Sequence, residues 1–589
     1  MKIIFRQNIP DDINKPFGIY QYDEVAAQNQ YYIDIRGIVR ENSWNWLDEV
    51  QASYSDVSKG FLRYTRLWWL TGMSRLDVRP WWQESLVKPL LYANAVLEWI
   101  RLTPDVKEIM LVGCDPMVAA YLKEFDEELI LEGKRKVPKY LYIFFQAIKH
   151  SVLALIKILM EAYRIGKHHM FKRSVNIEFS TIVLYELVPG LSVTSGYKYF
   201  YGSLFDSVKD METESIGYCC IEYTGSNIKR DRAELTKSNS VFFLFDSMSV
   251  SDLAVSILKN IYIILVTSIV AFTKIRCPIS GSLSLRFWPN YLFQEMGRVP
   301  CLNAICAYTA LKSLLKQSPQ CKLVVYPYEE KGIERAILFA CQKYGIRTIG
   351  YTPHPQYRSA LSLRDNTNPL QPKPSRYAVC GSAYVDYFTS WGKKNRNLIS
   401  IWGSEKSHRS NVDMHEINRS HLKILLLLSH PNELKVFYSW LRADSRISHS
   451  VAYTCRFYKA ASVREFENVF ALMMKEFNCI RESKGQLDED LKQCDMVAFC
   501  GTSAGPLSVN RGYLGMYLDL NDFLEINPCF DDLDAMLPCG SAKEFAYRLS
   551  EIRGMDDDSL MKMHQRQLSL VERIFSPVQI SNIREELLC

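Results

Sequence analysis

The chain has 589 residues, of which 48% are hydrophobic and 23% charged. This is the composition of an ordinary globular protein, and it excludes a disordered, collagenous or low-complexity chain. The formal net charge is +6, but residues 134–173 hold ten Lys or Arg and one acid, which leaves 61 basic against 64 acidic residues elsewhere. With one basic segment and no basic-aromatic module, the chain is not expected to bind nucleic acid.

Residues 1–133 are rich in tryptophan and contain the apolar run Glu108–Asp115 (EIMLVGCD). This run has the pattern of a strand buried on both faces, which is typical of parallel sheets. We therefore expect residues 1–133 to be the N-terminal α/β part of a first Rossmann-like domain, with a separate third domain as the alternative. The apolar patch at the start of the chain is too short for a signal peptide, so a cytoplasmic location with free thiols is expected.

Residues 134–175 predict a basic amphipathic helix. Apolar side chains recur at helical spacing from Leu141 to Tyr163, while Lys149, Lys157 and Arg164 fall on another stripe. One interpretation is a helix that lies on an anionic membrane surface, with these three cations at the lipid headgroups. The other is a core helix with a solvated basic face. Ten basic residues exceed what solubility requires, which favours the membrane surface.

The most apolar run is Asn260–Thr273 (NIYIILVTSIVAFT), between Lys259 and Lys274. Fourteen residues are too few to span a bilayer as a helix, which takes about 20. The run predicts a buried helix, and no transmembrane segment is expected.

From residue 176 onward, short apolar runs alternate with helical patterns, which indicates βαβ units and parallel sheets. We expect an acceptor-side Rossmann-like domain at 176–404, a polar linker at 405–421, a second Rossmann-like domain at 422–555 and a helical tail at 556–589. Strands are predicted at 322–328, 346–351, 376–381, 398–403, 422–428, 450–456, 495–501 and 515–520. Helices are predicted at 332–344, 431–443 and 463–477. Ligands of such sheets bind beyond the carboxyl ends of the strands.

Two strand ends of the first unit carry titratable groups. Glu329 and Glu330 follow the strand KLVVYPY and precede a helix, and His354 lies between two prolines after the next strand. Carboxylates here could act as a general base. His354 could act as an acid, as a base or as a hydrogen-bond donor to a phosphate. Alternatively, the acids are an ordinary pair at a helix start and His354 belongs to a rigid loop.

The second unit offers a candidate anion site. Gly501, Thr502 and Ser503 follow the strand DMVAFCG, and such small residues with free backbone N–H groups suit the phosphate of a nucleotide. The alternative is a capped helix start. His430 and Arg456 end two further strands, and either could face the nucleotide. His430 before Pro431 fits an ordinary helix start equally well.

The chain resembles bacterial GT-B glycosyltransferases of surface polysaccharide and lipopolysaccharide synthesis in the order of six segments: YPYEEKGIERA, GIRTIGY, PSRYAVCGSAYVDYFTSWG, LISIWGS, CGTSAG and LDLNDFLEINPCF. It is most similar to a surface-carbohydrate biosynthesis family, itself distantly similar to bacterial sialyltransferases and Kdo transferases. The resemblance covers roughly residues 175–550, and WWLTGMSRLDVRPWW resembles the N-terminal part of that family. It implies a GT-B-like fold with two Rossmann-type domains facing a cleft.

The resemblance also implies roles for residues. Glu329, with Glu330 beside it, corresponds to the acidic motif that supplies the base for the acceptor hydroxyl, and Thr502 and Ser503 correspond to the hydroxyl pair that binds the CMP phosphate. The His-Pro motif expected after the second strand of the C-terminal unit is absent, because the chain reads TCRFYK there. Arg456 would then take over the phosphate contact, or the nucleotide is not CMP.

The expected activity is an inverting, metal-independent transfer of a sugar from a nucleotide sugar, with a CMP-sugar favoured, to a lipid-linked glycan acceptor. No cofactor is expected, and peripheral contact with the anionic inner membrane would bring the enzyme to its acceptor. Two alternatives remain: a GT-B nucleotide-sugar epimerase, and an inactive GT-B-like scaffold of a polysaccharide assembly complex.

Overall fold

The protein is described by a computed structural model, in which the placed residues lie in 22 stretches of the chain. These are 2–6, 18–22, 31–33, 46, 87–102, 108–112, 130–132, 139–169, 178–186, 196–206, 215–221, 240–276, 302–329, 331–355, 363, 372–406, 414–449, 451–457, 463–483, 485–520, 526–529 and 532–588.

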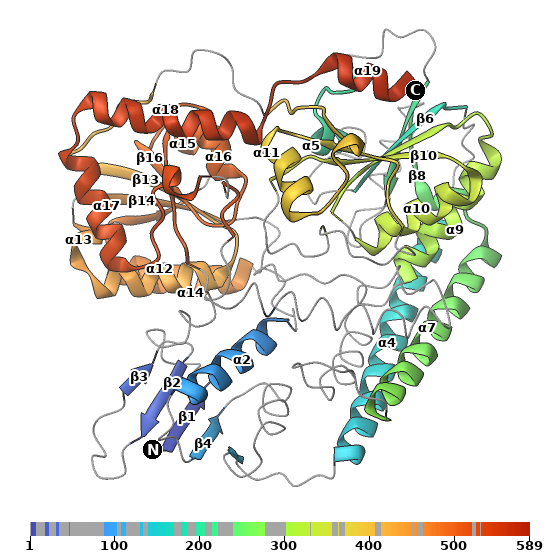
Figure 1. The fold of residues 1–589 in the computed structure, drawn as a ribbon, viewed down its shortest axis with the longest axis horizontal. Coiled ribbons are helices and arrows are strands. Elements are labelled where there is room, and N and C mark those ends of the chain that lie inside the picture. The colour runs from blue at the N-terminus through green and yellow to red at the C-terminus, as the bar shows by residue number, and fades with distance from the viewer. Residues whose placement is uncertain are drawn as a thin grey trace.

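A seven-stranded parallel sheet forms the first Rossmann-type domain (Figure 1). Its spatial order is β12-β11-β10-β9-β6-β7-β8. The chain first forms β6, β7 and β8 in one direction across the sheet, then returns to the other side of β6 and adds β9, β10, β11 and β12 in the opposite direction. Every neighbouring pair is parallel. The strands are β6 (Thr181–Glu186), β7 (Ile216–Ile221), β8 (Val241–Phe243), β9 (Leu323–Pro327), β10 (Arg347–Thr352), β11 (Arg376–Val379) and β12 (Ile399–Ile401).

Helices α9 (Leu302–Gln317) and α10 (Gly332–Tyr344) pack against each other beside this sheet. Buried side chains recur along α9 at helical spacing, and they join those of β6 and β9 in one apolar core. The shorter elements of this domain are α5 (Tyr197–Tyr201), η4 (Leu244–Ser247), α11 (Ala383–Asp386), η6 (Tyr387–Trp391) and η7 (Arg396–Leu398).

The second domain is a five-stranded parallel sheet in the order β15-β14-β13-β16-β17. Its strands are β13 (Leu422–Leu428), β14 (Val451–Phe457), β15 (Ile480–Glu482), β16 (Met496–Phe499) and β17 (Leu514–Tyr517). Its helices are α12 (Pro431–Ala443), α13 (Ser445–Ser448), α14 (Val463–Glu476), α15 (Leu487–Leu491), α16 (Ala504–Val509), η8 (Leu533–Met536) and α17 (Ala542–Gly554). The two parallel α/β sheets predicted from the sequence are thus confirmed.

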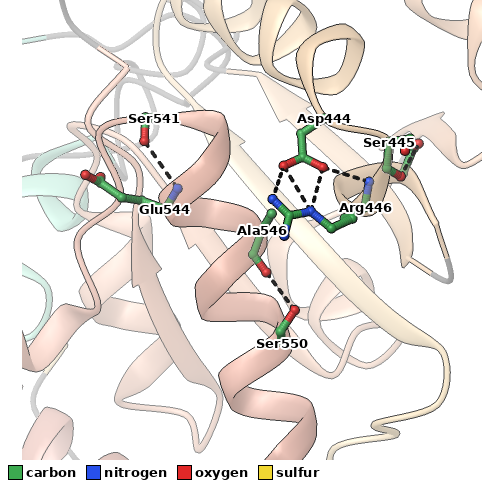
Figure 2. Close-up of polar contacts among 8 residues, drawn as sticks. Asp444, Ser445, Arg446, Ser541, Glu544, Ala546 and Ser550 are labelled. Carbon is green, nitrogen blue, oxygen red and sulfur yellow. Dashed lines mark hydrogen bonds and ion pairs between the residues drawn. The ribbon is translucent and has the colours of Figure 1, made fainter.

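Two helices of the second domain begin at side-chain caps (Figure 2). The hydroxyl of Ser541 accepts a bond from the backbone N–H of Glu544 at 3.2 Å, where α17 starts. The carboxylate of Asp444 accepts from the backbone N–H of Arg446 at 3.0 Å and also pairs with its guanidinium. Each cap satisfies an N–H group that the first helical turn leaves without a partner.

The C-terminal helices return the chain to the first domain. Helix α18 (Asp557–Ile574) packs on α16 of the second domain and on α11 of the first, and α19 (Ile580–Leu588) buries Ile583 and Leu587 in the core around β6. Gly403 allows the close approach: a Cβ built on it would lie 2.1 Å from the carbonyl oxygen of Pro577, and its φ is +78°. The tail therefore contacts both domains.

The described strands of residues 1–133 form a separate sheet in the order β3-β2-β1-β4-β5. They are β1 (Lys2–Arg6), β2 (Gly18–Tyr22), β3 (Tyr31–Ile33), β4 (Glu108–Val112) and β5 (Ile130–Glu132), and α2 (Val87–Leu102) lies nearby (Figure 1). These strands pair with one another and not with those of the seven-stranded sheet, and two of the four pairings are antiparallel. The strand predicted in Glu108–Asp115 is confirmed.

Two long helices run side by side and extend away from the first sheet (Figure 1). They are α4 (Lys139–His169), the predicted basic helix, and α7 (Val250–Arg276). The prediction of a buried helix at Asn260–Thr273 is only half right, because α7 starts ten residues earlier and exposes Leu265 (57%) while it buries Val266. Of the described helices, the segment Val250–Ala271 is long and apolar enough to cross a membrane, although a core helix of a soluble protein passes the same test.

Candidate functional site

Strand order places one candidate ligand site in each Rossmann-type sheet. In an open parallel sheet the crevice for a ligand forms at the carboxyl ends of the two strands between which the chain reverses its direction of growth. Those strands are β6 and β9 in the first sheet, and β13 and β16 in the second. Candidate residues are therefore sought where these four strands end.

The first reversal point holds a lysine between two carboxylates. Lys331 Nζ lies 2.9 Å from Glu186 Oε2, at the end of β6, and 3.4 Å from Glu329 Oε2, just after β9. All three side chains are only 12–21% exposed. The ion pair thus bridges the two strands and presents Glu329, our candidate base, at the edge where a ligand would lie. Glu330 lies outside the described residues.

A further carboxyl group, Glu334, lies beneath this cluster in the first turn of α10. It is 3% exposed, and its Oε2 accepts the backbone N–H of Glu329 at 2.8 Å. Burial raises the pKa of Glu334 well above its ordinary value, and the negative charges of Glu329 and Glu186 act in the same direction, while Lys331 opposes them. Glu334 therefore holds the backbone of Glu329 in place.

His354 belongs to the same neighbourhood and pairs with Lys406. Lys406 Nζ lies 2.9 Å from His354 Nδ1, and the imidazole packs beside the ring of Tyr199 at 5.2 Å between centroids. Burial, with a smaller contribution from the positive charge of Lys406, lowers the pKa of His354 well below its usual range, so the imidazole is neutral. Burial also lowers the pKa of Lys406 to about 8. An ammonium that donates to Nδ1 leaves the imidazole proton on Nε2, which suits a hydrogen-bond donor better than a general acid.

The structure therefore brings Glu329 and His354 together, and it adds residues that sequence reasoning missed: Glu186, Lys331 and Lys406. Glu186 had a usable signal, since it is a carboxylate that ends the apolar run TIVLYE. Lys406 had none, because it lies in the polar segment that we interpreted as a linker.

At the second reversal point, Gly501, Thr502 and Ser503 lie between the end of β16 and the start of α16. Thr502 and Ser503 are partly exposed, and Thr502 Oγ1 accepts the backbone N–H of Ala504 at 3.3 Å. The turn is therefore accessible, with one hydroxyl in a local cap. Its position beside the end of β13 is the one expected for a ligand of this sheet.

His430 follows β13, on the other side of the same reversal point. It is 8% exposed, and its backbone N–H and that of Ser429 both donate to the Glu433 carboxylate, at 3.2 and 2.7 Å. Helix α12 begins at Pro431, so this segment has the helix-start geometry that was one of our two interpretations.

Arg456 is held by its own domain. Its Nη1 lies 2.8 Å from Asp490 Oδ2 and 2.8 Å from the carbonyl oxygen of Gly485, and the Asp490 side chain is 7% exposed. A phosphate contact from this nitrogen would compete with a buried carboxylate.

Other regions of the described chain add little to these two sites. Among the described residues, no three His, Cys, Asp or Glu side chains are close enough together to hold a metal ion. A hollow of about 410 Å³ opens at the amino-terminal edge of the second sheet, beside Lys423, Tyr453 and Arg481, on the opposite edge from the reversal point. Of the proposed membrane-surface cations, Lys149 is exposed and Lys157 partly buried, and the side chain of Arg164 lies outside the description.

No family model matches the chain, and no curated protein sequence matches it either. Solved structures similar in shape include the lipopolysaccharide outer core galactosyltransferase WaaB in its apo form (10% identity, TM-score 0.40, 69% of this chain and 99% of that chain). Others are a trehalose-6-phosphate structure from E. coli bound with UDP-2-fluoro glucose (11%, 0.38, 69% and 98%) and Anabaena HepE in complex with UDP (10%, 0.38, 69% and 99%).

Proposed function

We propose that the protein is a GT-B-type glycosyltransferase that takes a sugar from a nucleotide donor and transfers it to a glycan acceptor in bacterial surface polysaccharide or lipopolysaccharide synthesis. The observation that carries the proposal is the pair of reversal points: carboxylates and a lysine occupy the first, and an accessible turn with two hydroxyls occupies the second. The sequence resemblance assigns the base and the phosphate contact to these same two places.

The proposed reaction is a single displacement with inversion. Glu329 takes the proton of the acceptor hydroxyl while that oxygen forms a bond to the anomeric carbon of the donor. The bond from this carbon to the donor phosphate breaks, and the phosphate leaves with the electron pair. Lys331 and Glu334 hold Glu329 in place. The Nε2–H of His354 donates a hydrogen bond to the negative charge that develops during the transfer. Thr502, Ser503 and the backbone of their turn receive the phosphate, with no metal ion in the mechanism.

The proposed donor is a CMP-activated ulosonic acid such as Kdo or a sialic-acid-like sugar. Support comes from the sequence resemblance around the turn CGTSAG. The contact of Arg456 with Asp490 weighs against Arg456 as the phosphate ligand, which leaves Thr502 and Ser503 as the favoured contacts.

The proposed acceptor is a lipid-linked glycan at the cytoplasmic face of the inner membrane, which the protein would meet as a peripheral protein. Support comes from the exposed apolar stripe of α4, where Phe145, Leu159 and Tyr163 are 60–71% exposed. Deleting that stripe would release the protein from its acceptor.

The first experiment is a thermal-shift panel of CMP, CDP, UDP, UMP, GDP and ADP on purified full-length protein. A ligand at a hundredfold excess over its Kd stabilises the folded state by about 2.7 kcal/mol, or roughly 5 °C or more in Tm for domains of this size. We expect a shift with CMP that is lost in a Thr502→Val/Ser503→Ala variant and kept in the control Ser550→Ala, whose hydroxyl donates to the Ala546 carbonyl within α17.

A Tm shift with UDP or GDP alone would show that the donor carries that nucleotide and not CMP, and it would leave the fold assignment unchanged. Absence of any shift would contradict the enzyme and favour the scaffold, and conversion of a nucleotide sugar without acceptor would favour the epimerase. With donor and acceptor in hand, Glu329→Gln should lower turnover by about 10²–10⁴-fold and leave the nucleotide shift unchanged. Near-normal turnover would remove Glu329 from the mechanism.

A further inference from the structure

Exposed apolar side chains are concentrated on the paired helices α4 and α7. Among the described residues, 25 large apolar side chains are exposed, and 15 of these lie on the two helices, nine on α4 and six on α7. Single exposed apolar residues are normal on a protein surface, but a concentration of this kind marks an interaction site.

Each helix keeps its exposed side chains on one face. On α4, Ile148, Val152, Leu155, Leu159 and Tyr163 follow one another at intervals of three or four residues and are 41–71% exposed. The opposite face of α4 buries Ala154, Ile158 and Ile165 against the first domain. The outward face of α4 is therefore apolar, the reverse of an ordinary surface helix.

The outward stripe of α7 has the same character. Val255, Leu258, Tyr262, Leu265 and Ile269 are 44–66% exposed and again recur every three or four residues. The other face of α7 packs on α4 and α9, where Ile263, Val266 and Val270 are buried. Helix α7 thus carries a second exposed apolar stripe, and the two helices pack against each other.

We infer that α4 and α7 together form one docking surface that lies flat on an anionic lipid bilayer, with both stripes at the acyl boundary. The distribution of charge along the chain favours an anionic bilayer over a second copy of the protein. Residues 134–173, which include α4, have a net charge of +9 while the rest of the chain has −3, so an anionic lipid surface attracts this part of the chain and a second copy of it would be repelled. Lys149 is exposed on the same helix, and its long side chain can extend to the headgroups.

Packing favours flat docking over a membrane span. The helix segment Val250–Ala271 has the length and composition of a span, but 44% of its most apolar window is buried in the protein. Its buried face also carries Ser256, Asn260 and Thr267, and Ser256 lies 3.3 Å from Thr309 of α9, hydroxyl to hydroxyl. A spanning α7 would have to leave α9 and the first-domain core. An amphipathic helix at the interface keeps both contacts.

This inference deepens the membrane part of the proposed function and does not depend on glycosyl transfer, because vesicle binding is measured without nucleotide or acceptor. The probe is co-sedimentation of the full-length protein with phosphatidylcholine vesicles that contain 0 or 30% phosphatidylglycerol, at low and high salt. We expect binding to the anionic vesicles that weakens as salt screens the charges.

The variant is Leu159→Glu/Leu265→Glu, with one change on each stripe, and each single variant is measured as well. The matched control is Leu472→Glu/Tyr547→Glu, at apolar positions of the second domain that are 50 and 62% exposed. We expect at least a tenfold loss of vesicle binding for the double variant, a part of it from Leu265→Glu alone, and little change for the control. Equal Tm values for variant and control show that folding is kept.

Several outcomes overturn the inference. These are no binding of the wild type to anionic vesicles, an equal loss in the control, or no effect of Leu265→Glu. Resistance to alkaline carbonate extraction would show a spanning helix instead. A wild-type dimer that becomes a monomer in the double variant would show that a second copy covers the surface. A nucleotide shift without vesicle binding would leave the proposed glycosyl transfer standing, and it would overturn this inference together with the proposed membrane location.

Discussion

Partly buried charges of opposite sign are paired at the first reversal point. Lys331 separates the carboxylates of Glu186 and Glu329, and Lys406 faces the neutral imidazole of His354. A buried ion pair is costly unless each partner is matched, so such a group of charges is weak evidence for stability and better evidence for a site. Lys406 is the member whose titration can be measured without a substrate.

Replacement of Lys406 by Met should change the pH dependence of stability. The pKa of Lys406 is about 8 in the folded protein against an ordinary 10.5, so between these values the unfolded chain binds more protons and the lysine makes stability rise with pH. Below pH 8 the cost of burying the ammonium is present in full. We expect Lys406→Met to be the more stable protein at pH 7, by up to about 3 kcal/mol, and its advantage to shrink toward pH 10.5.

The measurement is urea unfolding of wild type and variant across pH 7–10.5, read as the difference between the two. Burial raises the pKa values of many thiols and phenols in the folded protein, and these groups titrate in this range once the chain unfolds. The difference between the two proteins cancels their contribution. The control Lys316→Met removes an exposed lysine of α9 instead. A difference between wild type and Lys406→Met that does not change with pH would contradict the depressed pKa of Lys406.

At the scale of elements, local pattern predicted much of the fold. The helices at 332–344 and 431–443 and the strand at 422–428 begin and end where predicted, because Gly, Pro or a polar residue stops each apolar pattern at that place. Local pattern could not predict that β6 pairs with β9 across more than 130 residues, and so could not bring Glu186 to Lys331. Sequence reasoning found Glu329 and His354, which follow adjacent strands. It did not find Glu186, which lies on the other side of the reversal point.

Helix α7 shows the limit of reasoning from an apolar run. The run NIYIILVTSIVAFT is apolar all round, which suggests full burial. Upstream, Ser251, Asp252 and Ser256 extend the helix by further turns, and α9 covers only one side of it. The remaining apolar side chains are therefore exposed. Tertiary packing decides which side of a helix a neighbouring helix covers, and an apolar run in the sequence does not predict that side.

At the scale of the whole molecule, the tail couples the two Rossmann-type domains. From α18, on the second domain, the chain passes beside Gly381 and Gly403, and α19 then lies on the first sheet. Two hydrogen bonds hold it there. The backbone N–H of Gln579 donates to the Trp402 carbonyl at 2.9 Å, and the guanidinium of Arg347 donates to the Glu586 carbonyl at 2.5 Å. A ligand that binds at both reversal points would therefore bridge two domains that the tail already holds together.

Ile583 tests this coupling. Its side chain is fully buried in the core with Trp402 and Tyr185, whereas Ile580 on the same helix is 41% exposed. We expect Ile583→Ala to lower the free energy of unfolding by about 2–5 kcal/mol, and Ile580→Ala by less than about 0.5 kcal/mol. The readout is urea unfolding followed by circular dichroism, with the nucleotide shift of the second domain measured in parallel. If the tail couples the domains, Ile583→Ala should also split one transition into two, because the first domain loses its anchor while the second keeps its core. Equal effects of the two variants would show that α19 does not hold the first domain.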